Sequence, residues 1–400
     1  MPRVNPEILR WARETAGLTP EQAAEKLKLR PARGLSSLTR LTALETGEEV
    51  PTRPTLVTMA KVYRRPLIVF YMSRTPRRGD RGQDFRTLPA GHSVTDEALL
   101  DALIRDVRAR QSMVRAVMED EDEAELLAFI GSMKRSDGVE AVLSSIQETL
   151  GITSAALYAQ ASAPEAFSLL RGRTEKIGVF VLLRGDLGSH HSAIDLETFR
   201  GLALADDVAP FVVVNDQDSR AAWSFTLLHE LAHLWLGQTG VSGERAELSI
   251  ERFCNDVASQ FLLPADELNQ LSLAGTSNTE VIRERIAGFA GTRNLSSTMV
   301  AYRLYRARRL NDETWNYLRN TFRERWFQER GRQRERGREQ EGGPNFYVVR
   351  AHRVGSALLN LVERMMGAGA LTTSKAGKVL GVKPTQVEAL LKQREGRRLA

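Results

Sequence analysis

Two histidines four positions apart give the most specific chemical signal in the chain. They stand in His229-Glu230-Leu231-Ala232-His233, and with six histidines in 400 residues chance would produce this pattern about 0.01 times. Residues four apart share one face of a helix, so both imidazoles can bind one metal ion, and Glu230 lies near that face, where its carboxylate can hold a water molecule. The spacing predicts one Zn²⁺ per chain, bound by His229 and His233. The alternative is that the two histidines only pack against or cap a helix.

A catalytic zinc ion usually has three protein ligands. Glu251 is favoured as the third, because it begins a predicted helix whose apolar face would turn towards the core and whose carboxylate could reach the first helix. Glu244 and Glu247 remain alternatives. The other histidines are expected to lie away from the site, at the surface: His92, His190, His191 and His352.

The elements that must position these residues change in character along the chain. Runs of β-branched and aliphatic residues bounded by glycine, aspartate or asparagine predict short strands in the centre, and helical periodicity dominates elsewhere. A small sheet with helices around it is an α+β fold that is mainly helical. The central strands are predicted over 177–183, 199–205 and 210–214, and the helices that carry the zinc ligands over 223–236 and 248–263.

Charge is distributed unevenly. The net charge of +6 is the sum of +8 over residues 1–86, −14 over 87–300 and +12 over 301–400. Basic segments on both sides of an acidic centre favour an anionic partner such as double- or single-stranded DNA. The alternative is a set of solvated faces of unequal sign.

The composition excludes several classes of protein. A hydrophobic fraction of 42% and a charged fraction of 26% are typical of a globular chain. No apolar run reaches the length of a membrane span, and the first residues contain no secretory hydrophobic region. The single cysteine, Cys254, excludes internal disulfides and is expected to be a buried small hydrophobe. These features predict a cytoplasmic protein without a membrane partner.

The two ends are predicted to be helical. Short helices are expected before residue 74, followed by an exposed Pro/Gly/Arg-rich loop over 74–82. The Arg/Glu-rich stretch 323–341 contains two glycines and no apolar stripe, which favours a mobile exposed segment over a helix. Two short helical patterns within 371–392 outline a helix-turn-helix.

Several motifs follow one another in the centre of the chain. In chain order they are Phe199-Arg200-Gly201, Pro210–Asn215, Phe225–His233, Glu251 with Asn255 and Ala258, and Leu262-Leu263-Pro264. Together they resemble the motifs of the ImmA/IrrE family of bacterial and phage metallopeptidases. The resemblance covers about residues 140–300 and implies that His229, His233 and Glu251 bind zinc, that Glu230 is the general base, and that Asn255 supports the site. It also implies a regulatory protease that cuts a partner repressor.

The N-terminal part is similar to the Xre/Cro-like helix-turn-helix domains that are often fused ahead of such peptidases. The similarity rests on Leu18–Ala24, on Leu41 to Gly47 and on Asp84-Phe85-Arg86. It implies DNA contacts by Ser36, Ser37, Thr39 and Arg40, although the long turn over 28–35 departs from the family pattern and leaves a protein-docking domain as the alternative. The tail that begins Gly342-Gly343-Pro344 also resembles tails of such fusions.

Together these observations predict four parts: a helix-turn-helix domain over 1–73, a linker and helical segment over 74–139, a zinc peptidase over 140–300 and a basic helical domain over 301–400. The expected function is cleavage of a repressor, itself a helix-turn-helix protein, to induce genes after stress or DNA damage. The alternatives are a DNA-binding regulator with a structural or vestigial zinc site, and an antitoxin or phage regulator that acts by protein contact. The sequence leaves the substrate and the oligomeric state open.

Overall fold

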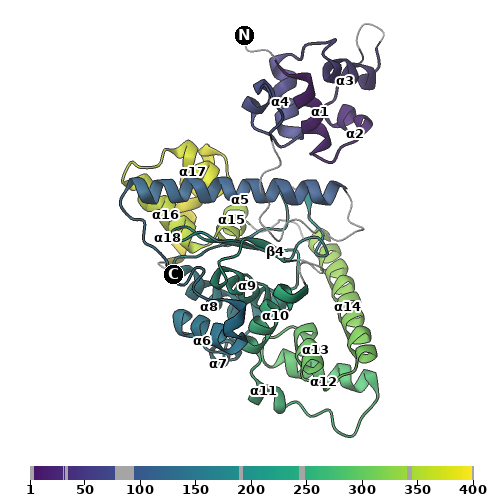
Figure 1. Cartoon of the computed structure of the whole chain (residues 1–400), viewed down its shortest axis with the longest axis vertical. Coiled ribbons are helices and arrows are strands. Elements are labelled where there is room, and N and C mark those ends of the chain that lie inside the picture. The colour runs from purple at the N-terminus through teal and green to yellow at the C-terminus, as the bar shows by residue number, and fades with distance from the viewer. Residues whose placement is uncertain are drawn as a thin grey trace. The chain divides into compact units, whose positions relative to one another are not determined.

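The computed structural model describes residues 4–29, 31, 35–76, 94–188, 192–242, 248–339 and 345–398. The chain divides into two compact units, one formed by residues 1–106 with 186–198 and the other by 107–185 with 199–400. The long helix α5 (Val94–Asp120) contributes residues to both (Figure 1). Each unit is described by itself below.

The first unit begins with the short helices that the sequence predicts. Thr19 and Gln22 form the capping box that starts one of them, and Gly47, in the left-handed region at a φ of +85°, ends another. Arg13 on the first of these helices and Glu45 on the third form a buried ion pair, with 2.8 Å between Nε and Oε1. The helices are α1 (Pro6–Glu14), α2 (Pro20–Lys26), α3 (Ser37–Thr46), α4 (Arg53–Val62) and the 3-10 turn η1 (Leu67–Tyr71).

A four-stranded sheet lies at the centre of the second unit, with the order β1-β3-β2-β4. The strands are β1 (Phe180–Leu183), β2 (Gly201–Leu204), β3 (Phe211–Val214) and β4 (Gly240–Ser242); β1 pairs parallel with β3, and the other pairs are antiparallel. The three predicted strands are confirmed, although β1 is shorter than expected because residue 177 still caps the preceding helix. The sequence did not predict β4.

Both faces of this sheet are buried. Val181, Leu183, Val212 and Val214 face the core that helix α9 also enters, and the alternate residues of the same strands are buried as well. Helix α9 covers one face, and α15 and α16 contact β1 from the other (Figure 1). Burial on both faces explains why these strands are continuous apolar runs without polar alternation.

Helices make up the rest of the second unit. Those on the α9 side of the sheet and those of the C-terminal region are connected by the long helix α14 (Figure 1). They are α6 (Val139–Leu150), α7 (Ser154–Tyr158), α8 (Ala163–Lys176), α9 (Arg220–Trp235), α10 (Leu248–Leu262), α11 (Ala265–Asn269), α12 (Thr279–Gly291), α13 (Ser297–Arg306), α14 (Asp312–Glu339), α15 (Phe346–Val354), α16 (Ser356–Gly367), α17 (Thr373–Leu380) and α18 (Val387–Arg398), with 3-10 turns η3 (Arg135–Asp137) and η5 (Pro384–Gln386).

The expectation of a mobile segment over 323–341 is wrong for residues 323–339, which belong to α14. Arginine, glutamate and glutamine are good helix formers, and their summed propensity outweighs two glycines that cost about 1 kcal/mol each. Aromatic residues add contacts one helical turn away: the guanidinium of Arg323 lies over Phe327, and that of Arg330 over Trp326.

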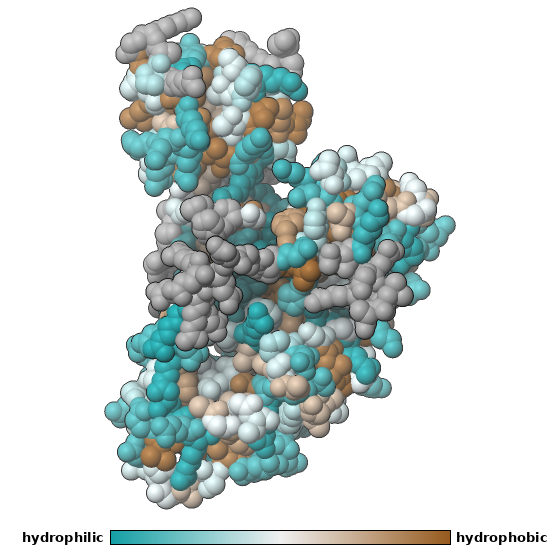
Figure 2. Space-filling model, turned by 180° about the vertical axis from the view of Figure 1, so that it is seen from behind, coloured by the Kyte–Doolittle hydropathy of each residue, from teal (hydrophilic) through white to brown (hydrophobic). Residues whose placement is uncertain are grey.

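The surface carries mixed polarity. Among the described residues, no helix combines the length and the hydrophobicity that crossing a bilayer requires. Figure 2 shows brown hydrophobic patches on the N-terminal helices set among hydrophilic side chains. Exposed apolar residues of these helices and their connections include Leu35, Leu38, Val50, Ile68 and Met72.

Candidate metal centre

Both histidines of the predicted site lie on α9, a helix buried on nearly every side. Its apolar residues contact β2 and β3 on one side and α8 and α10 on the other, so the helix has almost no polar face. Gly237, at a φ of +66°, follows its C-cap. The surrounding core therefore holds the two imidazoles in a fixed place relative to the sheet.

Glu251 reaches the site from α10, which packs directly against α9. It lies in the first turn of that helix, where the partial positive charge of the helix N-terminus favours a carboxylate. Phe253, Val257 and Phe261 anchor α10 in the shared core.

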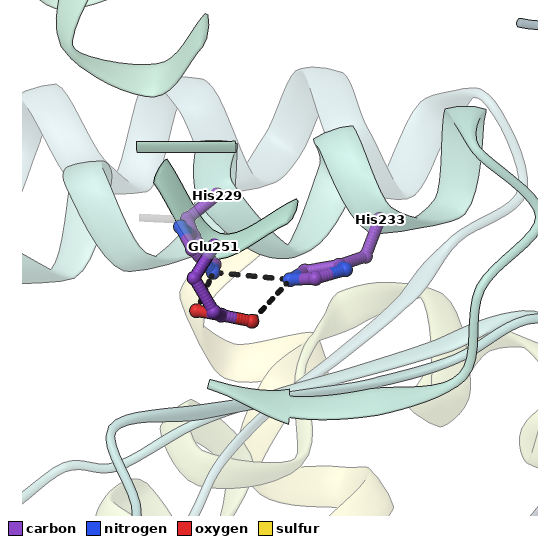
Figure 3. A group of neighbouring side chains, drawn as sticks. All are labelled: His229, His233 and Glu251. Atoms are coloured by element: carbon purple, nitrogen blue, oxygen red, sulfur yellow. Dashed lines mark hydrogen bonds and ion pairs between the residues drawn. The ribbon is translucent and has the colours of Figure 1, made fainter. Parts of the chain in front are cut away.

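The three side chains converge on one point (Figure 3). The Nε2 atoms of His229 and His233 are 3.1 Å apart. Oε2 of Glu251 lies 3.1 Å from Nε2 of His229, and Oε1 of Glu251 lies 3.2 Å from Nε2 of His233. Two ligands of a tetrahedral zinc ion with bonds of about 2.0–2.1 Å lie about 3.3–3.4 Å apart. The observed separations are close to those of atoms that share one small cation.

The charges of the three groups are strongly coupled. Burial by itself raises the pKa of Glu251, but the charges of and hydrogen bonds from His229 and His233 outweigh burial and lower that pKa to about 2. Burial by itself lowers the pKa of His233. The neighbouring Cys254, Glu251 and Glu230 outweigh burial, so the pKa of His233 lies well above its ordinary value. The site therefore concentrates negative charge where a cation would bind.

Glu230 is completely buried and lies close enough to His233 to influence its pKa. Its carboxylate faces β2 at Gly201. A Cβ at position 201 would overlap Oε1 of Glu230 and would approach Cγ2 of Thr226 to 2.7 Å. The missing side chain of Gly201 thus leaves the space that the Glu230 carboxylate occupies.

The residues present fit a zinc ion. Two imidazole nitrogens and a carboxylate are a donor set that zinc prefers, and all three side chains are buried. Nδ1 of each histidine is buried without a hydrogen-bond partner among the described residues, so packing orients the rings with Nε2 towards the shared point. The described residues contain no other cluster of three such ligands.

The structure also places the remaining candidate residues. Asn255 lies one helical turn beyond Glu251 on α10, half-buried, and Cys254 is completely buried, which raises the pKa of its thiol. His352 lies on α15, is exposed as expected, and is not part of the cluster. His92, His190, His191, Glu244 and Glu247 lie outside the described residues.

The residues expected to contact DNA all make contacts inside the N-terminal helices. Ser36 caps α3 and bonds to Thr39, whereas Ser37 donates to the carbonyl oxygen of Leu29. Arg40 donates to Glu49 at 2.8 Å. These contacts stabilise the N-terminal part of α3 and its packing against neighbouring segments.

Sequence reasoning missed two residues that shape the site. Gly201 is one. Asn215 is the other: it is fully buried at the end of β3 and donates to the carbonyl oxygen of Phe199 at 2.8 Å, which ties this end of β3 to the segment that leads into β2. Both belong to motifs that carried the family resemblance, but their roles depend on contacts between distant segments.

Two family models match the chain. Residues 181–305 match the IrrE N-terminal-like domain of a peptidase family, and residues 7–67 match a helix-turn-helix domain. The first match contains all of the sheet except the first residue of β1, together with α9 and α10, and therefore Glu230 and the three clustered side chains. No curated protein and no solved structure gave a match. The resemblance noted in the sequence is confirmed: a helix-turn-helix module precedes an IrrE N-terminal-like peptidase domain.

Proposed function

We propose that the protein is a zinc-dependent endopeptidase in which His229, His233 and Glu251 hold one zinc ion and Glu230 is the general base. The observation that carries the proposal is the close approach of the two Nε2 atoms and the two Glu251 carboxylate oxygens, with separations of 3.1–3.2 Å, buried beside a second acidic side chain, that of Glu230. A purely structural zinc site has no use for Glu230, which supports a catalytic role.

When bound, zinc would polarise the scissile carbonyl group and make a nearby water molecule more acidic. The protein itself supplies the proton transfers. Glu230 accepts a proton from the attacking water and delivers it to the leaving amine, and its confinement between α9 and β2 keeps the carboxylate in place for both steps. His229, His233 and Glu251 would hold the ion, and a site with three protein ligands would remain open to water and substrate.

The substrate we propose is a repressor protein, itself of the helix-turn-helix type, whose cleavage induces stress or DNA-damage genes in the cytoplasm. The family resemblance supports this choice. Charge supports a nucleic-acid partner: residues 87–300, which contain the candidate metal centre, carry −14, and the flanking segments carry +8 and +12. Contacts with DNA therefore belong to the flanks rather than to the metal centre.

The proposal is tested by incubating the full-length protein with the repressor encoded beside its gene, with and without a metal chelator. Cleavage should require about one zinc per chain. Glu230→Gln should retain the metal and lose cleavage by about 10²–10⁴-fold, whereas His229→Ala should lose both. Cleavage by Glu230→Gln at the wild-type rate contradicts the assignment. Promoter binding without cleavage favours a regulator with a structural zinc site, and a stable uncut complex favours a protein-contact regulator.

A further inference from the structure

A second helix-turn-helix lies near the C-terminus, outside the part of the chain that either family model matches. Helix α17 begins at the capping residue Thr372 and ends at Gly381, which has a φ of +66°. Three residues, Gly381 to Lys383, then separate it from η5, which leads directly into α18. A helix-turn-helix joins two helices by a turn of three or four residues that often contains glycine, and its DNA-binding form places the second helix in the major groove. Here the three-residue turn is extended by η5 before α18 begins.

The turn is held tightly against the first helix. Val382 donates its backbone N–H to the carbonyl oxygen of Gly377 at 2.9 Å. A Cβ at position 377 would lie 2.9 Å from the carbonyl oxygen of Val382 and 3.2 Å from the nitrogen of Pro384, so glycine permits this close approach. Arg110 donates to the carbonyl oxygen of Val379 and Arg350 to that of Gly381, which fixes the end of α17.

The second helix has one buried and one exposed face. Val387 and Leu390 are fully buried, and α18 packs against α15 and α17. Thr385, Glu388 and Lys392 are exposed. Thr385 lies in η5, directly before α18, and Glu388 and Lys392 lie on α18 itself. A recognition helix presents side chains to base edges from this part of the motif.

Exposed lysines are concentrated on these two helices and the turn between them. Lys375 and Lys378 on α17, Lys383 in the turn and Lys392 on α18 are all exposed, and they are four of the nine lysines in the chain. Residues 371–398 contain seven lysines and arginines against two glutamates, a balance of +5. By contrast, the outward residues of α3 are uncharged, and its arginine, Arg40, is bonded to Glu49.

We propose that α17 and α18 form a duplex-DNA binding site. The start of α18 enters the major groove, where Thr385 and Glu388 can reach base edges, and a glutamate can accept from the amino group of cytosine. Lys378 and Lys383 flank the groove and contact phosphates. The proposal does not rest on the peptidase assignment, since the site uses none of the residues of the metal centre.

Fluorescence anisotropy with the full-length protein and a labelled mixed-sequence duplex of about 30 base pairs tests the site. Lys378→Glu with Lys383→Glu should weaken binding about tenfold or more and should reduce the slope of log affinity against log salt by about two. The matched control is Lys134→Glu with Lys176→Glu, exposed lysines elsewhere in the same unit, which should change neither quantity. Thermal melting checks folding, and Lys378→Ala with Lys383→Ala should give a smaller loss in the same direction.

A third pair, Thr39→Glu with Thr42→Glu on α3, separates this site from the N-terminal domain. Thr39→Glu completes a capping box with Ser36, so the helix should stay folded. The proposal is overturned if the wild type binds no duplex at low salt, or if the Lys378/Lys383 variants bind duplex as tightly as the wild type does. It is also overturned if only the α3 variant reduces binding. Repressor cleavage, which does not involve these lysines, remains a separate measurement.

Discussion

The backbone of Gly201 on β2 faces the carboxylate of Glu230 on α9 so closely that a side chain at position 201 would overlap it. The sheet therefore does more than support α9. Because α9 is packed against β2 and β3, and Gly201 pairs with Val214 in the middle of the sheet, the distance between strand and helix is fixed by the whole core. Glu230 can take this position only because residue 201 is a glycine.

Gly201→Ala should therefore displace Glu230 or push β2 away from α9. We expect cleavage to fall by about a hundredfold, since small misplacements of a catalytic group have effects of this size. The free energy of unfolding should fall by about 1–3 kcal/mol from overpacking. Zinc content should stay near one per chain, because position 201 does not contact the three clustered side chains.

The control for this substitution is Gly172→Ala on α8, where a Cβ meets no atom within 4 Å. It should leave cleavage unchanged and stabilise the helix by about 0.5–1 kcal/mol. Equal activity of Gly201→Ala and Gly172→Ala would contradict the positioning role of Gly201. Steady-state cleavage rates, metal analysis and urea unfolding provide the three measurements.

Three residues of the candidate site could be predicted because each is marked by a pattern within its own segment. His229 and His233 reveal themselves by helical spacing alone, and Glu251 by its place at the start of the next amphipathic helix. Gly201 could not be predicted in this way, because its role depends on the distance between β2 and α9. No periodicity within one segment carries that information.

A second contact between distant segments joins the C-terminal helices to the core. The Oε2 atom of Glu175 on α8 accepts from the backbone N–H groups of Ser356 and Ala357 at 3.0 and 3.2 Å, and so caps α16. Arg171, one turn earlier on α8, pairs with Glu175 at 3.0 Å and donates to the carbonyl oxygen of His352. Both charged side chains are buried.

Glu175→Ala should lower the free energy of unfolding by about 3–5 kcal/mol, because it leaves the Arg171 charge buried and the first turn of α16 uncapped. The double variant Arg171→Met with Glu175→Ala should lose less than the sum of the two single changes. Glu165→Ala, an exposed glutamate on the same helix, should cost about 1 kcal/mol or less. A loss for Glu175→Ala no larger than this control would contradict the anchor.

The fold was predictable wherever one local signal dominated. Apolar runs gave the three central strands, and caps such as Thr19 and Gly47 gave the helix ends. The strand β4 was missed because three residues, Gly240–Ser242, contain too little pattern and are defined only by pairing with β2. The sequence predicts a mobile segment in place of the end of α14 because the segment contains two glycines and no apolar stripe, but the summed helix propensity of the other residues outweighs both features.

Gly331 offers a direct test of α14. A Cβ at this position meets no atom within 4 Å, so Gly331→Ala should stabilise the helix by about 0.5–1 kcal/mol. Gly331→Pro should break α14 and lower the helical signal in circular dichroism. If both variants have the helical signal of the wild type, residues around 331 do not form a helix in solution.

The pH dependence of stability should reveal the turn between β2 and β3. Burial raises the pKa of Asp206, but hydrogen bonds from the backbone N–H groups of Ala209 and Val208 and from Arg115 outweigh it, so that pKa lies below its ordinary value of 3.8. Because the pKa is lower in the folded than in the unfolded chain, the carboxylate stabilises the fold at all pH values above about 4. This contribution is lost as the pH falls further, when the folded protein must also take up the proton.

Asp206→Asn separates this effect from the titration of other carboxylates. The amide keeps an acceptor for the turn but loses the charge opposite Arg115, which lies 2.8 Å away, so at pH 7 the variant should be less stable by about 1 kcal/mol. Unfolding by urea at a series of pH values should show the two proteins converging as the pH falls below about 4, because the unfolded wild-type chain then takes up the proton first and the folded carboxylate follows at a lower pH. Glu140→Gln, an exposed carboxylate on α6, should instead follow the wild-type curve over the whole range. A gap between wild type and Asp206→Asn that stays constant with pH would mean that the charge of Asp206 does not stabilise the turn.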